Sequence, residues 1–176
     1  MLRLFLTTKT KLQYNVSLDN FDTVLIGTPP KKYHFVAGEN RLKNELMKQF
    51  PDEKKAIITY FKMVNKILAD FSNLFLLKAL PLSLSRFLVW TGLYRIVAKR
   101  YTKAAKTTLQ NVLQKLTTNK DLRALLAYNY ICYGTEPSKA PFLLQALTVS
   151  HYMHGAYYPR GGPSSIPKKV IQSILR

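Results

Sequence analysis

The feature that most constrains this fold is a long apolar stripe with a helical repeat in residues 57–75. Its side chains recur at intervals of three and four residues, which places them along one face of an α-helix. Just before it, Phe50-Pro51-Asp52-Glu53 is typical of a helix start, because proline suits the first turn and acids favour the positive end of the helix dipole. The sequence therefore predicts a long helix with one broad apolar face, formed by Ile57, Tyr60, Phe61, Val64, Ile67, Leu68, Phe71 and Phe75.

The first 38 residues follow a different repeat, that of β-strands. Residues 12–18 alternate apolar and polar side chains, as in a half-buried strand. Two more apolar runs, 24–26 and 33–36, flank Gly27-Thr28-Pro29-Pro30, and a Gly/Pro turn between such runs is typical of a β-hairpin. We therefore expect a small antiparallel strand meander over residues 1–38.

Helical patterns continue through the rest of the chain. Asn119 is placed to cap a helix over residues 121–133, and a further helix is expected over residues 138–154. Strands do not alternate with helices, which excludes a doubly wound nucleotide-binding fold. The predicted fold class is therefore α+β and predominantly helical, with short N-terminal antiparallel strands followed by about six helices. We expect one domain over residues 1–176, made of the strand meander (1–38), the helices (39–155) and a loop with a last helix (156–176).

The charge of the chain is strongly basic and unevenly distributed. Lysine and arginine number 27 against 9 acids, a formal net charge of +18, and beyond Asp70 the only acids are Asp121 and Glu136. Such a field attracts nucleic acid, an acidic membrane surface or an acidic partner, and charge alone does not choose among them. The basic residues between Asp70 and Asp121 are Lys78, Arg86, Arg95, Lys99, Arg100, Lys103, Lys106, Lys115 and Lys120.

Residues 67–94 are the most apolar region, but Asp70, Lys78 and Arg86 interrupt it. Its uncharged runs are far shorter than the roughly 20 residues that cross a bilayer, so we predict no transmembrane helix. A buried helical pair is the favoured interpretation, and the alternative is that residues 71–94, with flanking lysine and arginine, lie against a membrane interface. Residues 1–6 are too short an apolar run for a signal peptide.

Few residues have the pattern of a reactive site. Cys132 is the only cysteine, which excludes an intrachain disulfide, and we expect a buried, inert thiol there. His151 and His154 have a spacing that zinc accepts, but no cysteine or acid lies within a dozen residues, so no metal is expected. We expect His151 instead to hold a hydrogen bond beside the loop over residues 157–162. We find no Ser-His-Asp order, no paired carboxylates and no Walker loop, so no catalytic residue is assigned.

The strongest candidate for a binding site is the loop Tyr157-Tyr158-Pro159-Arg160-Gly161-Gly162. Two glycines permit positive φ angles and let a ligand approach the backbone, and the helix expected after them would direct N–H groups at an anion. The arginine adds a planar donor, and the tyrosines add flat apolar surfaces. On these residues alone, a plain turn before a helix is the simpler interpretation.

Four motifs change this assessment. They are residues 50–57 (FPDEKKAI), 77–82 (LKALPL), 133–138 (YGTEPS) and 151–166 (HYMHGAYYPRGGPSSI). In order and spacing they resemble motifs of the carotenoid-isomerase and phytoene-desaturase-like family of FAD-dependent oxidoreductases, from about Tyr14 to the end of the chain.

The resemblance implies that the chain is an internal fragment, mainly the substrate-binding segment of a flavoenzyme that reduces a double bond of all-trans-retinol or a related polyene. It implies FAD as the cofactor, NAD(P)H as a source of electrons, and an endoplasmic-reticulum location with peripheral membrane contact. The implied site residues are Arg160, Gly161 and Gly162 for the cofactor and Tyr157, Tyr158 and His151 for the substrate cavity.

The chain also departs from the family. It lacks the Gly-x-Gly-x-x-Gly dinucleotide fingerprint and the C-terminal FAD-binding portion, and Ser165 stands where the family usually has Glu. We therefore expect this chain to be inactive in isolation. Two other functions stay open: a non-catalytic interaction or membrane-peripheral segment that uses the basic helical face and, more distantly, a nucleic-acid binder. The basic residues match no nucleic-acid reading motif, so no nucleic acid is expected.

Overall fold

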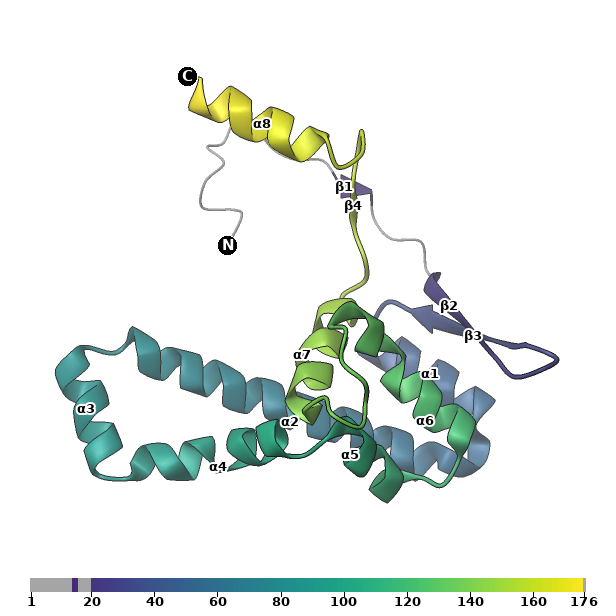
Figure 1. Ribbon diagram of the computed structural model, residues 1–176, viewed down its shortest axis with the longest axis horizontal. Helices are drawn as coiled ribbons and strands as arrows, with labels where there is room; N and C mark the ends of the chain where they lie inside the picture. The colour runs from purple at the N-terminus through teal and green to yellow at the C-terminus, as the bar shows by residue number, and fades with distance from the viewer. Residues whose placement is uncertain (1–13, 16–19, 176) are drawn as a thin grey trace.

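The structure, a computed structural model, describes residues 14–15 and 20–175 (Figure 1). Eight α-helices and four short strands in this part of the chain confirm the predicted α+β, predominantly helical class. The helices are α1 (Glu39–Gln49), α2 (Lys54–Ala79), α3 (Leu82–Trp90), α4 (Leu93–Lys106), α5 (Leu109–Leu116), α6 (Lys120–Ala127), α7 (Phe142–Tyr152) and α8 (Ser165–Ile174). The strands are β1 (Tyr14–Asn15), β2 (Asn20–Ile26), β3 (Lys31–Val36) and β4 (Tyr158–Pro159), and the 3₁₀ turns are η2 (Pro51–Glu53) and η3 (Tyr128–Cys132).

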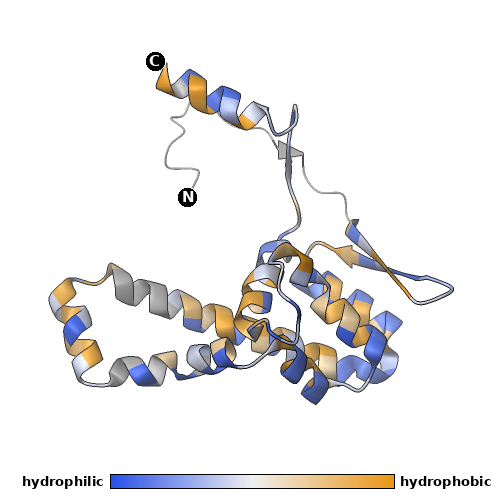
Figure 2. Cartoon of the chain, in the orientation of Figure 1, coloured by the Kyte–Doolittle hydropathy of each residue, from blue (hydrophilic) through white to orange (hydrophobic). Residues whose placement is uncertain are grey.

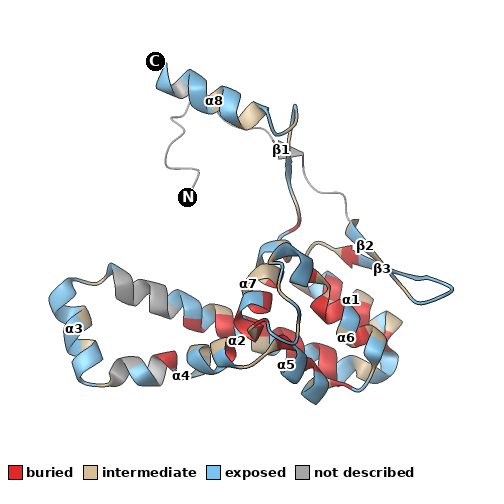
Figure 3. Ribbon diagram, in the orientation of Figure 1, coloured by how far each residue is buried: buried red, intermediate tan, exposed pale blue. Residues whose placement is uncertain are grey.

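Helix α2 is the central element of the molecule, and its predicted apolar face is confirmed from Ile57 to Leu68, whereas Phe71 is 37% exposed and the Phe75 side chain lies outside the described residues. Pro51 opens the turn η2 that leads into it. Ile57 and Val64 are fully buried, and Tyr60 is 1% exposed. Helices α1, α4, α5 and α7 pack against α2, so the buried residues gather around its first half (Figure 3). Removing such a face from water stabilises the fold by roughly 25 cal/mol for each Å² of apolar surface.

The predicted hairpin is also present. Strands β2 and β3 pair antiparallel, with Val24 opposite Tyr33, and the turn falls at residues 27–30 as expected. Tyr33 and Phe35 alternate into the core, and the Tyr33 ring stacks on Phe50 with 5.6 Å between ring centroids. The hairpin therefore closes one side of the helical core through a single face of β3.

The third expected strand does not join the hairpin, so the meander prediction is wrong on this point. Strand β1 pairs antiparallel with β4, with Tyr14 opposite Pro159 and Asn15 opposite Tyr158. The remainder of the strand expected over residues 12–18 lies outside the described residues. An alternating pattern identifies a strand but not its partner, and this partner lies near the other end of the chain.

The helix predicted over residues 121–133 is present in two parts. Asn119 caps α6 as predicted, because its Oδ1 accepts a hydrogen bond from the Leu122 N–H at 3.0 Å. The chain then tightens into η3. Cys132 lies in this turn and is exposed, so the expectation of a buried thiol is wrong. Its Sγ lies 3.5 Å from the hydroxyl oxygen of Tyr152.

Helix α7 begins at Phe142, four residues after the predicted start. The backbone carbonyls of Pro137 and Ala140 accept hydrogen bonds from the N–H groups of Gln110 and Leu109 in α5, at 2.9 and 2.8 Å. The segment before α7 therefore satisfies the first N–H groups of α5, which would otherwise lack acceptors.

Helix α3 contradicts the favoured interpretation of a buried helical pair. None of its residues is buried, and it lies at the far end of the arm formed by the second half of α2 and by α4 (Figures 1 and 3). Much of α3 is nevertheless apolar (Figure 2). Its exposed apolar side chains are Leu82 (66%), Leu84 (44%), Phe87 (53%), Val89 (62%) and Trp90 (83%). In the described chain, no helix combines the length and the apolar character that a membrane crossing requires.

Helix α8 forms a second projection, which the β1–β4 pair joins to the helical body (Figure 1). Its apolar side chains Val170, Ile171 and Ile174 are exposed, as is Leu175 just after the helix. The molecule thus consists of a helical body with a core and two projections whose apolar faces meet solvent.

Candidate functional site

The predicted binding loop lies at the base of the second projection, between α7 and α8. Its residues Tyr158 and Pro159 form β4, and the pairing with β1 fixes that part of the loop to the N-terminal segment. Chain segments far apart in the sequence therefore meet at this loop, which the sequence pattern did not indicate.

The two glycines adopt the conformations that the sequence analysis expected. Gly161 has φ 82° and Gly162 has φ 78°, a region that side-chain-bearing residues rarely occupy. The Gly162 N–H donates to the Pro159 carbonyl at 3.2 Å, and the Gly162 carbonyl accepts from the Ser165 N–H and Oγ–H at 3.1 and 2.7 Å. A Cβ on Gly162 would meet nothing within 4 Å. The glycine is therefore required by backbone geometry, and the space beside its Cα is open.

The aromatic and basic residues of the loop are exposed. Tyr157 and Tyr158 are 55% and 58% exposed, and Arg160 is also exposed. The Tyr157 hydroxyl donates to the His154 carbonyl at 2.9 Å, which fixes its ring against the end of α7. Tyrosine faces, a guanidinium and an open glycine backbone thus occupy one surface region.

The two histidines lie at the end of α7. His151 is exposed and makes no hydrogen bond within the described chain, whereas we expected it to hold one beside the loop. His154 Nδ1 lies 3.2 Å from the Ser150 carbonyl oxygen. Over residues 14–15 and 20–175, no group of three histidine, cysteine or acidic side chains is placed to hold a metal ion.

A buried polar network below the loop was not found from the sequence. Gln145 is fully buried in α7, and its Nε2 donates to the Leu126 carbonyl at 2.7 Å. Its Oε1 accepts from the Tyr133 hydroxyl at 2.9 Å, and the Tyr60 hydroxyl donates to the same Leu126 carbonyl at 3.2 Å. Burial raises the pKa of Tyr133 to about 12 and raises that of Tyr60 further. The sequence signal that could have revealed this network is a glutamine inside an otherwise apolar helix.

This network ties α7 to α2 and to the segment around η3. Each buried polar group in it has a partner, which avoids the cost of about 1–3 kcal/mol for an unsatisfied buried group. The network therefore holds the first turns of α7 against α2 and the segment around η3. The binding loop follows the opposite end of α7, so the network does not contact it directly.

The chemistry of the loop residues is compatible with contacts to the flavin that the family resemblance implies. An open backbone at Gly162 accepts the edge of a planar ring, and Arg160 supplies N–H donors for ring oxygens or phosphate. The exposed tyrosine faces suit an apolar polyene or the flavin ring. The described residues contain no strand–glycine-loop–helix unit for the dinucleotide, so this loop by itself would not enclose a flavin.

The chain is similar to a segment of several curated proteins. It is 38% identical over 169 residues to the all-trans-retinol 13,14-reductase of Danio rerio, an alignment that covers 95% of this chain and 28% of that protein. It is 35% identical over 158 residues to the human all-trans-retinol 13,14-reductase, covering 89% of this chain and 26% of that protein. A Danio rerio protein named inactive all-trans-retinol 13,14-reductase is 32% identical over 155 residues, covering 87% and 25%.

These comparisons confirm the resemblance inferred from the four motifs. The chain spans about a quarter of the length of the curated relatives it matches. No protein-family model matches the chain, and no solved structure matches it significantly.

Proposed function

We propose, starting from this similarity, that the chain is the substrate-binding segment of a flavin-dependent oxidoreductase that reduces a double bond of all-trans-retinol or a related polyene. The observation that carries the proposal is the 38% identity over 95% of the chain, which includes the Pro-Arg-Gly-Gly loop. The names of the relatives support an oxidoreductase of retinoid metabolism. The proposal adds that the enzyme depends on a flavin and takes electrons from NAD(P)H.

In this proposal the loop residues have two binding roles. Arg160, Gly161 and Gly162 contact the flavin, while Tyr157 and Tyr158 bound the substrate cavity, with His151 behind them. When bound, FAD supplies the electrons that saturate the polyene. The residues of this chain orient the flavin and the polyene and exclude water from the space between them. The exposed apolar side of α8 packs against the FAD-binding portion, and without that portion the chain is inactive.

A chimera tests the proposal directly. The matching segment of the Danio rerio all-trans-retinol 13,14-reductase is replaced by this chain, and flavin absorbance and the saturation of all-trans-retinol are measured. We expect flavin-bound, active protein, and Arg160→Ala lowers activity about tenfold or more because the flavin contact is misplaced. Lys139→Ala, which removes an exposed ion pair with Glu136, is the control and leaves activity unchanged.

Since one relative of comparable identity is named inactive, activity has to be measured and not assumed. A chimera that folds and binds flavin but does not reduce retinol contradicts the proposal. So does an Arg160→Ala variant with the activity of the Lys139→Ala control.

A second function, peripheral membrane contact, is favoured by one observation, the exposed apolar surface of α3. The Phe87 and Trp90 rings lie 6.3 Å apart, centroid to centroid, and both are more than half exposed. Exposed Arg86, Arg95 and Lys99 are on the same arm, and the sequence has no acid between Asp70 and Asp121. An apolar face with flanking cations suits the interface of an anionic membrane, where tryptophan is enriched. In line with the family resemblance, we propose the endoplasmic-reticulum membrane.

Trp90 is the only tryptophan, so its fluorescence reports on α3 alone. With vesicles of phosphatidylcholine and phosphatidylserine we expect a blue shift that high salt weakens, and no shift with phosphatidylcholine alone. Phe87→Ser reduces vesicle binding, whereas Ile131→Ser, an equally apolar exposed position outside α3, does not. Unshifted fluorescence with anionic vesicles excludes this function.

A further inference from the structure

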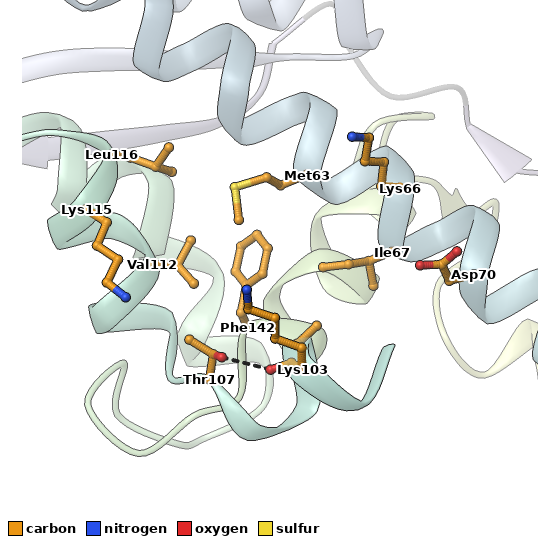
Figure 4. A pocket seen from close by; sticks show the side chains of 11 residues that line it. Met63, Lys66, Ile67, Asp70, Lys103, Thr107, Val112, Lys115, Leu116 and Phe142 are labelled. Atoms are coloured by element: carbon orange, nitrogen blue, oxygen red, sulfur yellow. Dashed lines mark hydrogen bonds between the residues drawn. The ribbon is translucent and has the colours of Figure 1, made fainter. Parts of the chain in front are cut away.

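A cavity of about 310 Å³ lies between helices α2, α4, α5 and the start of α7, and the proposed function does not use it (Figure 4). None of the loop residues 157–162 lines it. Its volume falls at the lower end of the range of roughly 300–1,000 Å³ typical of small-molecule sites. The cavity is therefore large enough for a ligand of its own.

The walls of the cavity are mostly apolar. Phe142 and Met63 face each other across it, and Val112 and Leu116 close the side of α5 (Figure 4). Phe142 is 1% exposed and Val112 is 7% exposed, so this part of the wall belongs to the core. Such a lining favours an aliphatic chain over a polar ligand, because burying a polar group there leaves it without hydrogen-bond partners.

Three lysines, Lys66, Lys103 and Lys115, also line the cavity, and all three are exposed. In Figure 4 the side chains of Lys103 and Lys115 extend from opposite sides toward the region of Phe142. None of the three lysines forms an ion pair with another described residue. Among the described residues that line the cavity, the only acid is Asp70, which is buried at 2% exposure. The cavity thus combines an apolar interior with an excess of positive charge at its opening.

The backbone at the opening is well ordered by hydrogen bonds. The Lys103 carbonyl accepts from both the Thr107 N–H and the Thr107 Oγ–H, at 3.0 and 2.8 Å. Thr107 thus forms the C-terminal cap of α4, next to the cavity. The backbone of Lys103 is therefore fixed at the end of α4, next to the cavity.

From this arrangement we infer that the cavity binds a single-chain lipid with an anionic head group, its chain against Phe142, Met63 and Val112 and its head paired with Lys103 and Lys115. A neutral alcohol of the same length leaves the lysines without a counterion. Free phosphate leaves the apolar wall unfilled. The site differs in ligand charge and in place from the loop proposed to contact flavin and substrate, so it stands independently of the proposed function.

The test is a calorimetric titration of the full chain with decanoate, decanol and inorganic phosphate, each below the concentration at which it aggregates. Decanoate is expected to bind more tightly than decanol, with an affinity that falls as salt rises, and phosphate is expected not to bind. In the variant Lys103→Gln/Lys115→Gln, the Kd for decanoate rises about fivefold, the sum of two partly exposed charge pairs. The Kd for decanol does not change.

Two further variants complete the test. Lys106→Gln removes an exposed lysine of the same helix that does not line the cavity, and it leaves both Kd values unchanged. Ala104→Leu places a larger side chain in the cavity wall and abolishes binding of decanoate and decanol alike, while circular dichroism confirms the fold. Equal affinity for decanoate and decanol, phosphate binding without a chain, or no binding by the unaltered chain each overturns the inference.

Discussion

The helical body and the arm that carries α3 make opposite use of apolar residues. In the body, α1 is mostly polar in sequence, yet its two leucines Leu42 and Leu46 are buried at 5% and 1% exposure. Helix α3 is mostly apolar, yet none of its residues is buried. The difference shows that burial follows from the presence of a packing partner and not from the apolar content of a helix.

The second projection repeats this contrast. Ile174 in α8 and Leu175 just after it are 75% and 80% exposed, whereas Leu122 in α6 is fully buried. Exposed apolar patches of this kind mark surfaces that contact another protein, a ligand or a membrane. The proposals for α3 and α8 assign a different partner to each, a membrane and the FAD-binding portion.

The largest expected effect is a difference in unfolding free energy between a substitution in the body and one in α3. Leu122→Ala removes a fully buried side chain and lowers the free energy of unfolding by about 3 kcal/mol. Trp90→Ala removes a larger side chain that is 83% exposed, and it changes the free energy of unfolding by less than about 0.5 kcal/mol. Urea denaturation followed by circular dichroism measures both. Equal losses mean that α3 packs against something in solution.

The next effect concerns the polar network in the body. Gln145→Leu leaves the Tyr133 hydroxyl without its acceptor and lowers the free energy of unfolding by about 2 kcal/mol. Gln114→Leu makes the same substitution at an exposed position of α5 and changes stability by less than about 0.5 kcal/mol. The same denaturation experiment compares the two. If Gln145→Leu is neutral, the network does not hold α7 in place.

The smallest effect compares the starts of two helices, one in each region. Asn119→Ala removes a cap whose Oδ1 accepts from the Leu122 N–H and costs about 1 kcal/mol. Ser164 stands before α8 but its side chain makes no capping hydrogen bond, so Ser164→Ala is near neutral. Thermal unfolding detects the difference as a lower Tm for the first variant alone. A similar loss for Ser164→Ala would show that the start of α8 contributes to the body.

Much of the local structure followed from the sequence. The α2 stripe, the cap at Asn119 and the β2–β3 hairpin were all predicted, because each depends on residues within a few positions of one another. Of the candidate site, the positive φ angles of Gly161 and Gly162 were predicted for the same reason. The hydrogen bond expected for His151 was not, because a side-chain partner is chosen by packing.

The sequence by itself determined where helices and the hairpin form and which curated proteins the chain resembles, since periodicity, turn chemistry and motif order are properties of neighbouring residues. Only the tertiary structure decided that β1 pairs with β4, that α3 is exposed and that four helices enclose a cavity with Lys103 and Lys115 at its opening. These features join residues far apart in the chain. Their free energy comes from packing and pairing between elements, and a local pattern does not specify the partner.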